Sequence, residues 1–383
     1  MTMTFSADAR NSLGTIGLAA ALLVPAANVH AQSSVTIYGV VDAAISNYRA
    51  TGAGSRTQLM PGGNQNSRLG FRGREDLGDG MYAGFELEAG LFNDSGVGQA
   101  SNTNNQASGA ASTPAAAGGQ GLVFSRRSFV TLGNKSWGEI RLGRDYTPGF
   151  WNLFAYDAFR TGVGLGGITT QGGATTVFRA SNSIGYFTPG CSAFVCQGFF
   201  GQAMYAMGEN ASGAANSDDG TYTGVRVGYG APKWDVAASH GVTKNVTAGD
   251  FTQTNVGGSY DFGVAKLMGM WGVHKTGLPV AALGNGTKAP FWQLSATIPV
   301  GAGYVPVAYT RVNRNDALDS SANKIAVGYV HSLSKRTVLY TTYARIKNSG
   351  SFQMPVNSGA EAGPIPVRGG TSSGFDFGIR HAF

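Results

Sequence analysis

The chain has 383 residues, of which 59 are Gly, while 42% are hydrophobic and only 13% are charged. This composition, with 21 Phe, 15 Tyr and 5 Trp, excludes disorder, which combines low hydrophobicity with high charge. Beyond residue 31 there is no run of about 18 apolar residues, which excludes a membrane protein built from helices. The net charge of +7 comes without a dense Lys/Arg run, so nucleic acid is not an expected partner. Abundant Gly, Val, Tyr and Phe instead indicate an all-β chain.

The first 31 residues have the pattern of a signal peptide. Arg10 precedes an apolar stretch at Leu13–Ala27, which ends in a small-x-small cleavage site at Val29–Ala31. We therefore expect a signal peptide at 1–31 and one mature β domain at 32–383. The alternative is a short N-terminal anchor, for which the apolar stretch is too short to span comfortably.

Period-two alternation dominates the rest of the chain and predicts strands. Between Val35 and Ile45 the odd positions are mostly apolar, and Phe375, Phe377 and Ile379 alternate with polar residues or Gly near the C-terminus. Sixteen strand centres are predicted, at Tyr38, Phe71, Phe85, Phe129, Arg141, Tyr186, Met204, Val227, Ala237, Val256, Met268, Leu294, Val307, Val327, Tyr340 and Phe377. A soluble sandwich would also alternate, and counts of fourteen or eighteen stay open.

The connections between these strands favour a closed antiparallel transmembrane barrel. Short turns, such as Asp76–Gly80 and Asn134–Trp137, alternate with long polar stretches, such as Tyr48–Gln65 and Phe92–Gly121. This asymmetry is expected when one rim of a barrel faces a confined compartment. An even strand count leaves no unpaired edge in lipid. Tyrosines near strand ends are predicted to form interfacial girdles, namely Tyr304, Tyr309, Tyr329, Tyr340 and Tyr343.

The two cysteines, Cys191 and Cys196, are separated by four residues in a predicted short connection. In an exported chain such a pair most simply forms a disulfide. Two free thiols are the alternative. A metal site would need more ligands, and no His lies nearby, so no metal and no cofactor are expected.

Several segments spread over the mature chain resemble the trimeric Gram-negative general porins. They are SVTIYGVVD (34–42), SRLGFRGREDLG (67–78), GEIRLGR (138–144), NSIGY (182–186), VGYVHSLSKRT (327–337) and the ending GIRHAF (378–383). The resemblance implies a water-filled sixteen-stranded barrel, a homotrimer in the outer membrane, and a third long loop folded into the lumen. Here that loop lies between Thr147 and Phe178. The terminal Phe383 is similar to the family's assembly signal, although a plain strand end is the alternative.

Alternation also predicts which charged side chains face the lumen. They are Arg68, Arg72, Arg74, Glu86, Glu88 and Arg141. Arg126 and Arg127 are neighbours, so alternation admits only one of them and does not decide which. The Gly-rich stretch at Gly162–Gly167 lacks the Lys-Ser/Thr of a phosphate loop.

The resemblance to the anion-preferring branch of the family implies which residues form the pore constriction. It favours Arg68, Arg126 and Arg179 as constriction arginines, with Glu88 and Asp157 as the acidic partners that hold them. The family's enterobacterial members carry a Pro-Glu-Phe-Gly motif and an acidic cluster on the third loop, and this sequence lacks both, which argues against a cation preference. The alternative is a set of ordinary lumen-wall ion pairs without special selectivity.

The expected function is passive diffusion of small anions and hydrophilic solutes. Rings of basic side chains are how anion-preferring pores are built. Outer-membrane lipid and lipopolysaccharide are the expected surroundings. An outer-membrane enzyme or adhesin is the alternative, but no His-x-x-x-His motif is present, so we do not expect an enzyme.

Overall fold

The structure, a computed structural model, describes residues 34–106, 108, 121–160, 165–168, 175–191, 194–279, 287–357 and 362–383. The predicted signal peptide lies outside these residues. The strands are β1 (Ser34–Ala50), β2 (Gly54–Pro61), β3 (Arg68–Gly78), β4 (Met81–Phe92), β5 (Val97–Gly98), β6 (Arg127–Asn134), β7 (Gly138–Tyr146), β8 (Arg179–Phe187), β9 (Gly198–Ala206), β10 (Tyr222–Gly230), β11 (Trp234–Thr243), β12 (Phe251–Asp261), β13 (Lys266–Thr276), β14 (Lys288–Val300), β15 (Gly303–Asn313), β16 (Ser321–Ser332), β17 (Thr337–Ser349) and β18 (Thr371–Ala382). Between β7 and β8, the described residues form an α-helix, α1 (Pro148–Ala155), and a 3₁₀ turn, η3 (Thr175–Val177).

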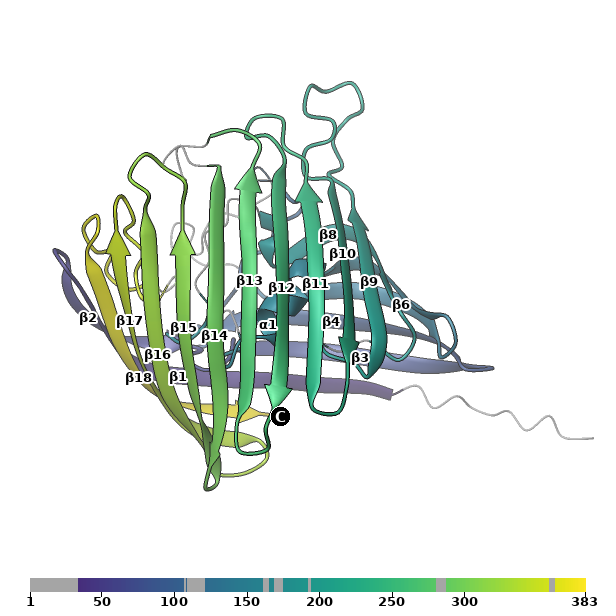
Figure 1. The fold of residues 1–383 in the computed structure, drawn as a ribbon. Helices are drawn as coiled ribbons and strands as arrows, with labels where there is room; N and C mark the ends of the chain where they lie inside the picture. The colour runs from purple at the N-terminus through teal and green to yellow at the C-terminus, as the bar shows by residue number, and fades with distance from the viewer. Residues whose placement is uncertain are drawn as a thin grey trace, which may run out of the picture.

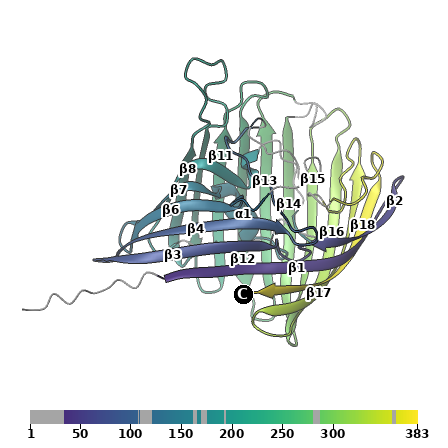
Figure 2. The same cartoon turned by 180° about the vertical axis from the view of Figure 1, so that it is seen from behind.

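These segments form one closed antiparallel barrel of sixteen strands (Figures 1 and 2). Neighbouring strands pair in chain order, and β1 pairs with β18 from Val40 to Ala50 to close the ring. The short β2 and β3 lie end to end along one edge of β1 and together make the second barrel strand. The two-residue β5 pairs only with the end of β4, outside the wall. All sixteen predicted strand centres fall within barrel strands, so the prediction is confirmed.

The two faces of the wall differ in the way that alternation predicts. On β10, Val225 and Val227 are 52% and 64% exposed, whereas Arg226 between them is buried. On β18, Phe375 and Phe377 are exposed and Asp376 between them is buried. Apolar side chains therefore cover the outside and polar ones the inside, which is the reverse of a soluble sandwich.

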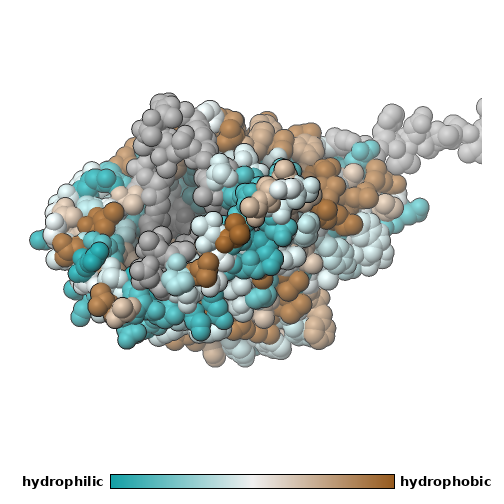
Figure 3. Space-filling model, turned by 90° about the horizontal axis from the view of Figure 1, so that it is seen from above, coloured by the Kyte–Doolittle hydropathy of each residue, from teal (hydrophilic) through white to brown (hydrophobic). Residues whose placement is uncertain are grey.

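The long and short connections lie at opposite rims (Figure 1). The short turns, including those after β10, β12 and β14, lie at the rim that also holds the C-terminus. Seen from above, hydrophilic residues gather over much of the opposite rim, where the long connections run (Figure 3).

Two details differ from the sequence predictions. The stretch Tyr48–Gln65 is not a long loop, because β1 continues to Ala50 and residues 54–61 return as β2 along its edge. Tyr340 is not an interfacial residue: its side chain is buried and its hydroxyl donates to Asp42. Alternation along β17 places Tyr340 on the inner face, and proximity to a strand end was not sufficient to place it outside.

The break between β2 and β3 is stabilised by one carboxylate. Asp42 accepts hydrogen bonds from the backbone N–H groups of Gly63 (3.2 Å), Asn64 (3.1 Å) and Gln65 (2.7 Å). A Cβ on Gly63 would lie 2.5 Å from the Tyr340 hydroxyl, so only Gly fits there. Successive N–H groups converging on a carboxylate form an anion-binding turn, here filled by the protein's own side chain.

Candidate functional site: the charged inner wall and the β7–β8 loop

The inner faces of β3, β4, β6 and β7 carry most of the predicted charged residues. Strand register sets Glu88 opposite Gly70 and Arg127, and Glu86 opposite Arg72. Paired residues point to the same face of a sheet, so the carboxylates and guanidinium groups of adjacent strands meet. Arg68, Arg72, Arg74, Glu86, Glu88 and Arg141 all lie on this face by register.

Three arginines converge on one carboxylate and one phenol, and we name this group the arginine cluster: Arg68, Arg126, Arg179, Glu88 and Tyr146. Arg126 Nε lies 2.6 Å from Glu88 Oε1, and Arg68 Nε lies 3.3 Å from Glu88 Oε2. The Tyr146 hydroxyl accepts from Arg126 Nη2 at 2.7 Å and from Arg179 Nη2 at 3.3 Å. Three fixed positive charges thus face a single negative charge.

Arg179 is the least neutralised member of the arginine cluster. Its guanidinium lies 4.7 Å from the centre of the Tyr146 ring, and its Nε has no hydrogen-bond partner among the described residues. Its hydrogen bond to Tyr146 is made to a neutral group. A half-buried guanidinium held by an aromatic face and a phenol keeps its whole charge available to a passing anion.

Next to the arginine cluster, Arg127 and Arg141 are paired with carboxylates. Arg127 Nη1 lies 2.9 Å from Glu86 Oε1, and Arg127 Nε lies 3.2 Å from Asp145 Oδ1. Arg141 contacts Glu139 and, at 2.7 Å, Asp145 Oδ2. Arg72 and Arg74 instead lie over the rings of Tyr38 and Tyr82, with guanidinium carbons 5.2 and 3.5 Å from the ring centres.

Arg126 and Arg127 both contact inner-face carboxylates, which differs from the expectation that only one could. Alternation holds only within a strand, and β6 begins at Arg127. Arg126 precedes it, and its backbone N–H donates to the Glu88 carbonyl oxygen. The backbone therefore turns between the two residues, so that Arg126 reaches Glu88 and Arg127 reaches Glu86.

Arg144 is a charged residue that the sequence analysis did not single out. Its guanidinium donates to the Ser125 carbonyl oxygen (2.7 Å), the Asn102 carbonyl oxygen (3.2 Å) and Ser181 Oγ (2.7 Å). β7 pairs Arg144 with Ser128, on the face opposite Arg141, so alternation holds here and leaves Arg144 outside the lumen. Arg144 ties the β4–β6 loop to the start of β8.

The β7–β8 loop begins with α1, which packs against the inner faces of β10, β11 and β12. Pro148 starts the helix at a position where a missing N–H costs nothing. Asn152, fully buried, donates to the Ala237 carbonyl oxygen (3.1 Å) and to Asn255 Oδ1 (2.9 Å) and accepts from Arg226 Nε. These partners lie on the face opposite the exposed Val225 and Val227.

Past α1, the loop contacts a different part of the wall. Asp157 Oδ1 accepts from Gln293 Nε2 on β14 at 3.0 Å, and its Oδ2 accepts from the Ile168 backbone at 3.0 Å. Lys324 on β16 donates to the Gly167 carbonyl oxygen at 2.9 Å. The structure thus brings together Arg68, Arg126, Arg179 and Glu88, whereas the contacts of Asp157 are with β14 and with its own loop.

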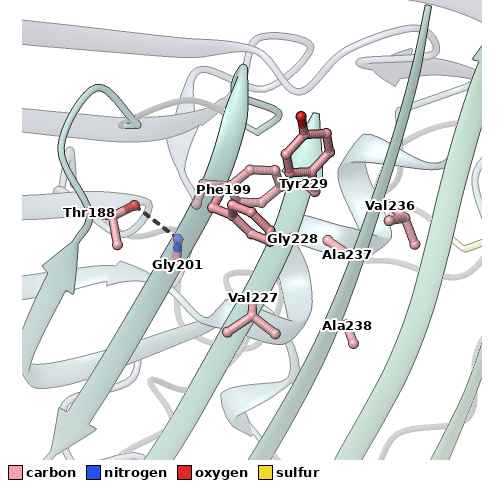
Figure 4. A pocket seen from close by; sticks show the side chains of 10 residues that line it. Thr188, Phe199, Gly201, Val227, Gly228, Tyr229, Val236, Ala237 and Ala238 are labelled. Carbon is pink, nitrogen blue, oxygen red and sulfur yellow. Dashed lines mark hydrogen bonds between the residues drawn. The ribbon is translucent and has the colours of Figure 1, made fainter. Parts of the chain in front are cut away.

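A groove of about 530 Å³ lies on the outside of β9, β10 and β11 (Figure 4). Phe199, Val227 and Val236 line it with exposed apolar side chains, and the Thr188 hydroxyl accepts from the Gly201 N–H at 2.9 Å. Its lining is almost wholly apolar and it is separated from the arginine cluster by the barrel wall, so it is no path for a charged solute.

In the described part of the chain, no group of three or more His, Cys, Asp or Glu is placed to hold a metal ion. No helix among the described residues is long and apolar enough to cross a membrane.

Comparison with known proteins agrees with this architecture. The family model for Gram-negative porins matches residues 17–351. The chain is 36% identical to outer membrane porin protein 32 of Delftia acidovorans, over 96% of this chain and 99% of that protein. It is 30% identical to an outer membrane porin protein of Bordetella pertussis, over 86% and 94% of the two chains. The structure of an anion-selective porin from Comamonas acidovorans matches with a TM-score of 0.75 and 34% identity, covering 92% of this chain and all of that one. The chain therefore belongs to the Gram-negative porin family, and its sixteen-stranded barrel is that of a porin of the bacterial outer membrane.

Proposed function

We propose that this porin passes small hydrophilic solutes by passive diffusion through its lumen and prefers anions over cations. One observation carries the anion preference: the arginine cluster sets Arg68, Arg126 and Arg179 against the single carboxylate of Glu88. One relative supports it, since the structure from Comamonas acidovorans, which is 34% identical, is named an anion-selective porin.

We propose that the β7–β8 loop narrows the lumen beside the arginine cluster. Its support is the set of contacts that the loop makes with two parts of the wall. Near its start, α1 bonds to β10, β11 and β12 through Asn152, and farther along Asp157 and Gly167 bond to β14 and β16. A segment tied to both β11 and β16 spans strands that are well separated around the ring. Asp157 then acts by holding the loop to Gln293, while Glu88 holds the arginines.

The remaining assignments rest on the family and on the sequence. We propose that residues 1–31 are a signal peptide, that the mature barrel assembles as a homotrimer among outer-membrane lipid and lipopolysaccharide, and that Phe383 is an assembly signal. Phe383 supports this role by its position: its backbone exchanges hydrogen bonds with Gly39 on β1, at 3.1 and 3.2 Å. An oligomer that dissociates only on heating in detergent electrophoresis would test the trimer.

The test of the function is the reversal potential of the purified porin in a planar bilayer under a potassium chloride gradient. We expect stepwise conductance and a reversal potential of the sign set by chloride. Absence of stepwise conductance would contradict the channel, and a potential set by potassium would contradict only the anion preference.

A further inference from the structure

The connection between β8 and β9 differs from the others on its rim. Six connections there, after β3, β6, β10, β12, β14 and β16, have two to four residues, whereas this one runs from 188 to 197. A disulfide joins Cys191 to Cys196 within it, with the two Cα atoms 5.5 Å apart. Both cysteines are buried, so the disulfide lies against the protein.

Phe194, between the two cysteines, stacks on the helix of the β7–β8 loop. Its ring centre lies 4.0 Å from that of Phe154, with the planes 20° apart, and 4.4 Å from that of Trp151. The Phe194 carbonyl oxygen accepts from Arg226 Nη2 on the inner face of β10. The disulfide-closed connection therefore reaches inward and contacts α1.

The position of α1 thus depends on two sets of contacts. The barrel wall holds it through Asn152, and the β8–β9 connection holds it through Phe194 and the rings of Trp151 and Phe154. A flexible connection of this length would have to be ordered before Phe194 could stack. A disulfide removes much of that freedom in advance, so the ring is presented in place.

We propose that Cys191, Phe194 and Cys196 form an internal brace that fixes α1 in the lumen, so that the conductance of the pore depends on the thiol–disulfide state of the two cysteines. The inference rests on the proposed channel function and adds a regulatory element to it. In an oxidising compartment the disulfide persists and the brace is set. A dithiol such as dithiothreitol would break the S–S bond: each cysteine sulfur gains one electron and one proton, and the reductant becomes its own cyclic disulfide.

The first test compares single-channel records of the wild-type porin, Phe194→Ala and the double variant Cys191→Ser/Cys196→Ser. Phe262→Ala, an exposed aromatic in the turn after β12, is the matched control. We expect the fraction of time spent away from the main conductance level to rise about tenfold in the two brace variants. A tenfold change corresponds to about 1.4 kcal/mol, which is the free energy that a lost aromatic contact supplies. Dithiothreitol should reproduce this in the wild type and add nothing in the double variant.

The second test does not depend on conduction. Amide hydrogen exchange of the segment 148–156 should be faster in both brace variants and in reduced wild type, and unchanged in Phe262→Ala. Reduction after assembly and the Phe194→Ala variant keep the test valid if the serine variant fails to fold. A wild type that does not conduct would contradict the proposed function, and the brace would then be judged on exchange alone. Unchanged exchange in Phe194→Ala and in reduced wild type, or unchanged conductance levels in a conducting porin, would overturn the brace.

Discussion

The arginine cluster predicts how much selectivity one side chain supplies. Arg179→Gln removes one of three positive charges that face one carboxylate, and it removes the one held only by the neutral Tyr146. At a distance of ~8 Å, a unit charge contributes ~0.5 kcal/mol in water and ~2 kcal/mol at an effective dielectric of ~20. Chloride entry should therefore become ~2-fold to ~30-fold less favourable and potassium entry more favourable by the same factor, so the ratio of chloride to potassium permeability should fall by at least ~5-fold.

The assay is the reversal potential under a potassium chloride gradient at several ionic strengths. Because the Debye length shortens from about 30 Å at 0.01 M to about 3 Å at 1 M, the effect of Arg179→Gln should shrink as salt rises. Two variants serve as controls. Arg179→Lys keeps the charge and should retain the anion preference, although it loses the planar contact with Tyr146. Arg336→Gln removes an equal charge from an exposed turn after β16 and should have little effect.

Two results would refute the electrostatic reasoning. Equal shifts in Arg179→Gln and Arg336→Gln would mean that net charge, and not its place in the wall, sets the potential. Raised conductance with unchanged selectivity in Arg179→Gln would mean that the side chain only narrows the lumen.

The other predictions concern assembly, topology and pH. Phe383→Ser should lower the yield of heat-resistant oligomer in outer-membrane fractions, because the last residue bonds to β1, and a normal yield would exclude that role. A cysteine placed at Leu278, in a long connection, should react with maleimide on intact cells, while one at Phe262 should not; the reverse pattern would invert the barrel. In the β15–β16 loop, burial would raise the pKa of the Asp316 carboxyl, but hydrogen bonds, led by those from Ser320, outweigh it and hold the pKa well below its usual range. Because its pKa is lower in the folded state than the unfolded value of about 3.9, the ionised Asp316 stabilises the folded loop above that pH, and this stabilisation is lost as pH falls further. Asp316→Asn should therefore raise proteolysis of this loop at pH 7 and have no effect at strongly acid pH. Equal proteolysis of both proteins at pH 7 would contradict this prediction.

The wall of the barrel could be predicted from the sequence because each strand carries its own evidence. Outward Val225 and Val227 around inward Arg226 are visible as a period of two, and the same pattern places Arg68 and Glu88 on one face. Strand β2 was missed because its Gly, Ser and Thr content resembles a loop, and only pairing with β1 makes it a strand.

The site could be predicted only in part, because its geometry depends on contacts that alternation does not encode. Arg126 lies just before β6, so counting residues along the strand misplaces it. The link between Phe194 and Phe154 joins two loops that are distant in the sequence. No local sequence pattern predicts such a contact. An unusually long turn that contains two cysteines indicates only that this connection differs from the others.

Closure of the ring pairs Val40 with Ala382, residues 342 positions apart. Contacts between such distant residues form slowly, since the whole intervening chain must be arranged first. Until β1 and β18 meet, the sheet has two free edges, each a row of unpaired N–H and C=O groups on which another copy can add a strand. A chain truncated before β18 keeps both edges unpaired. Translation must therefore be complete before the barrel can close. A truncated chain would expose edges that promote aggregation and would not form an open pore in the membrane.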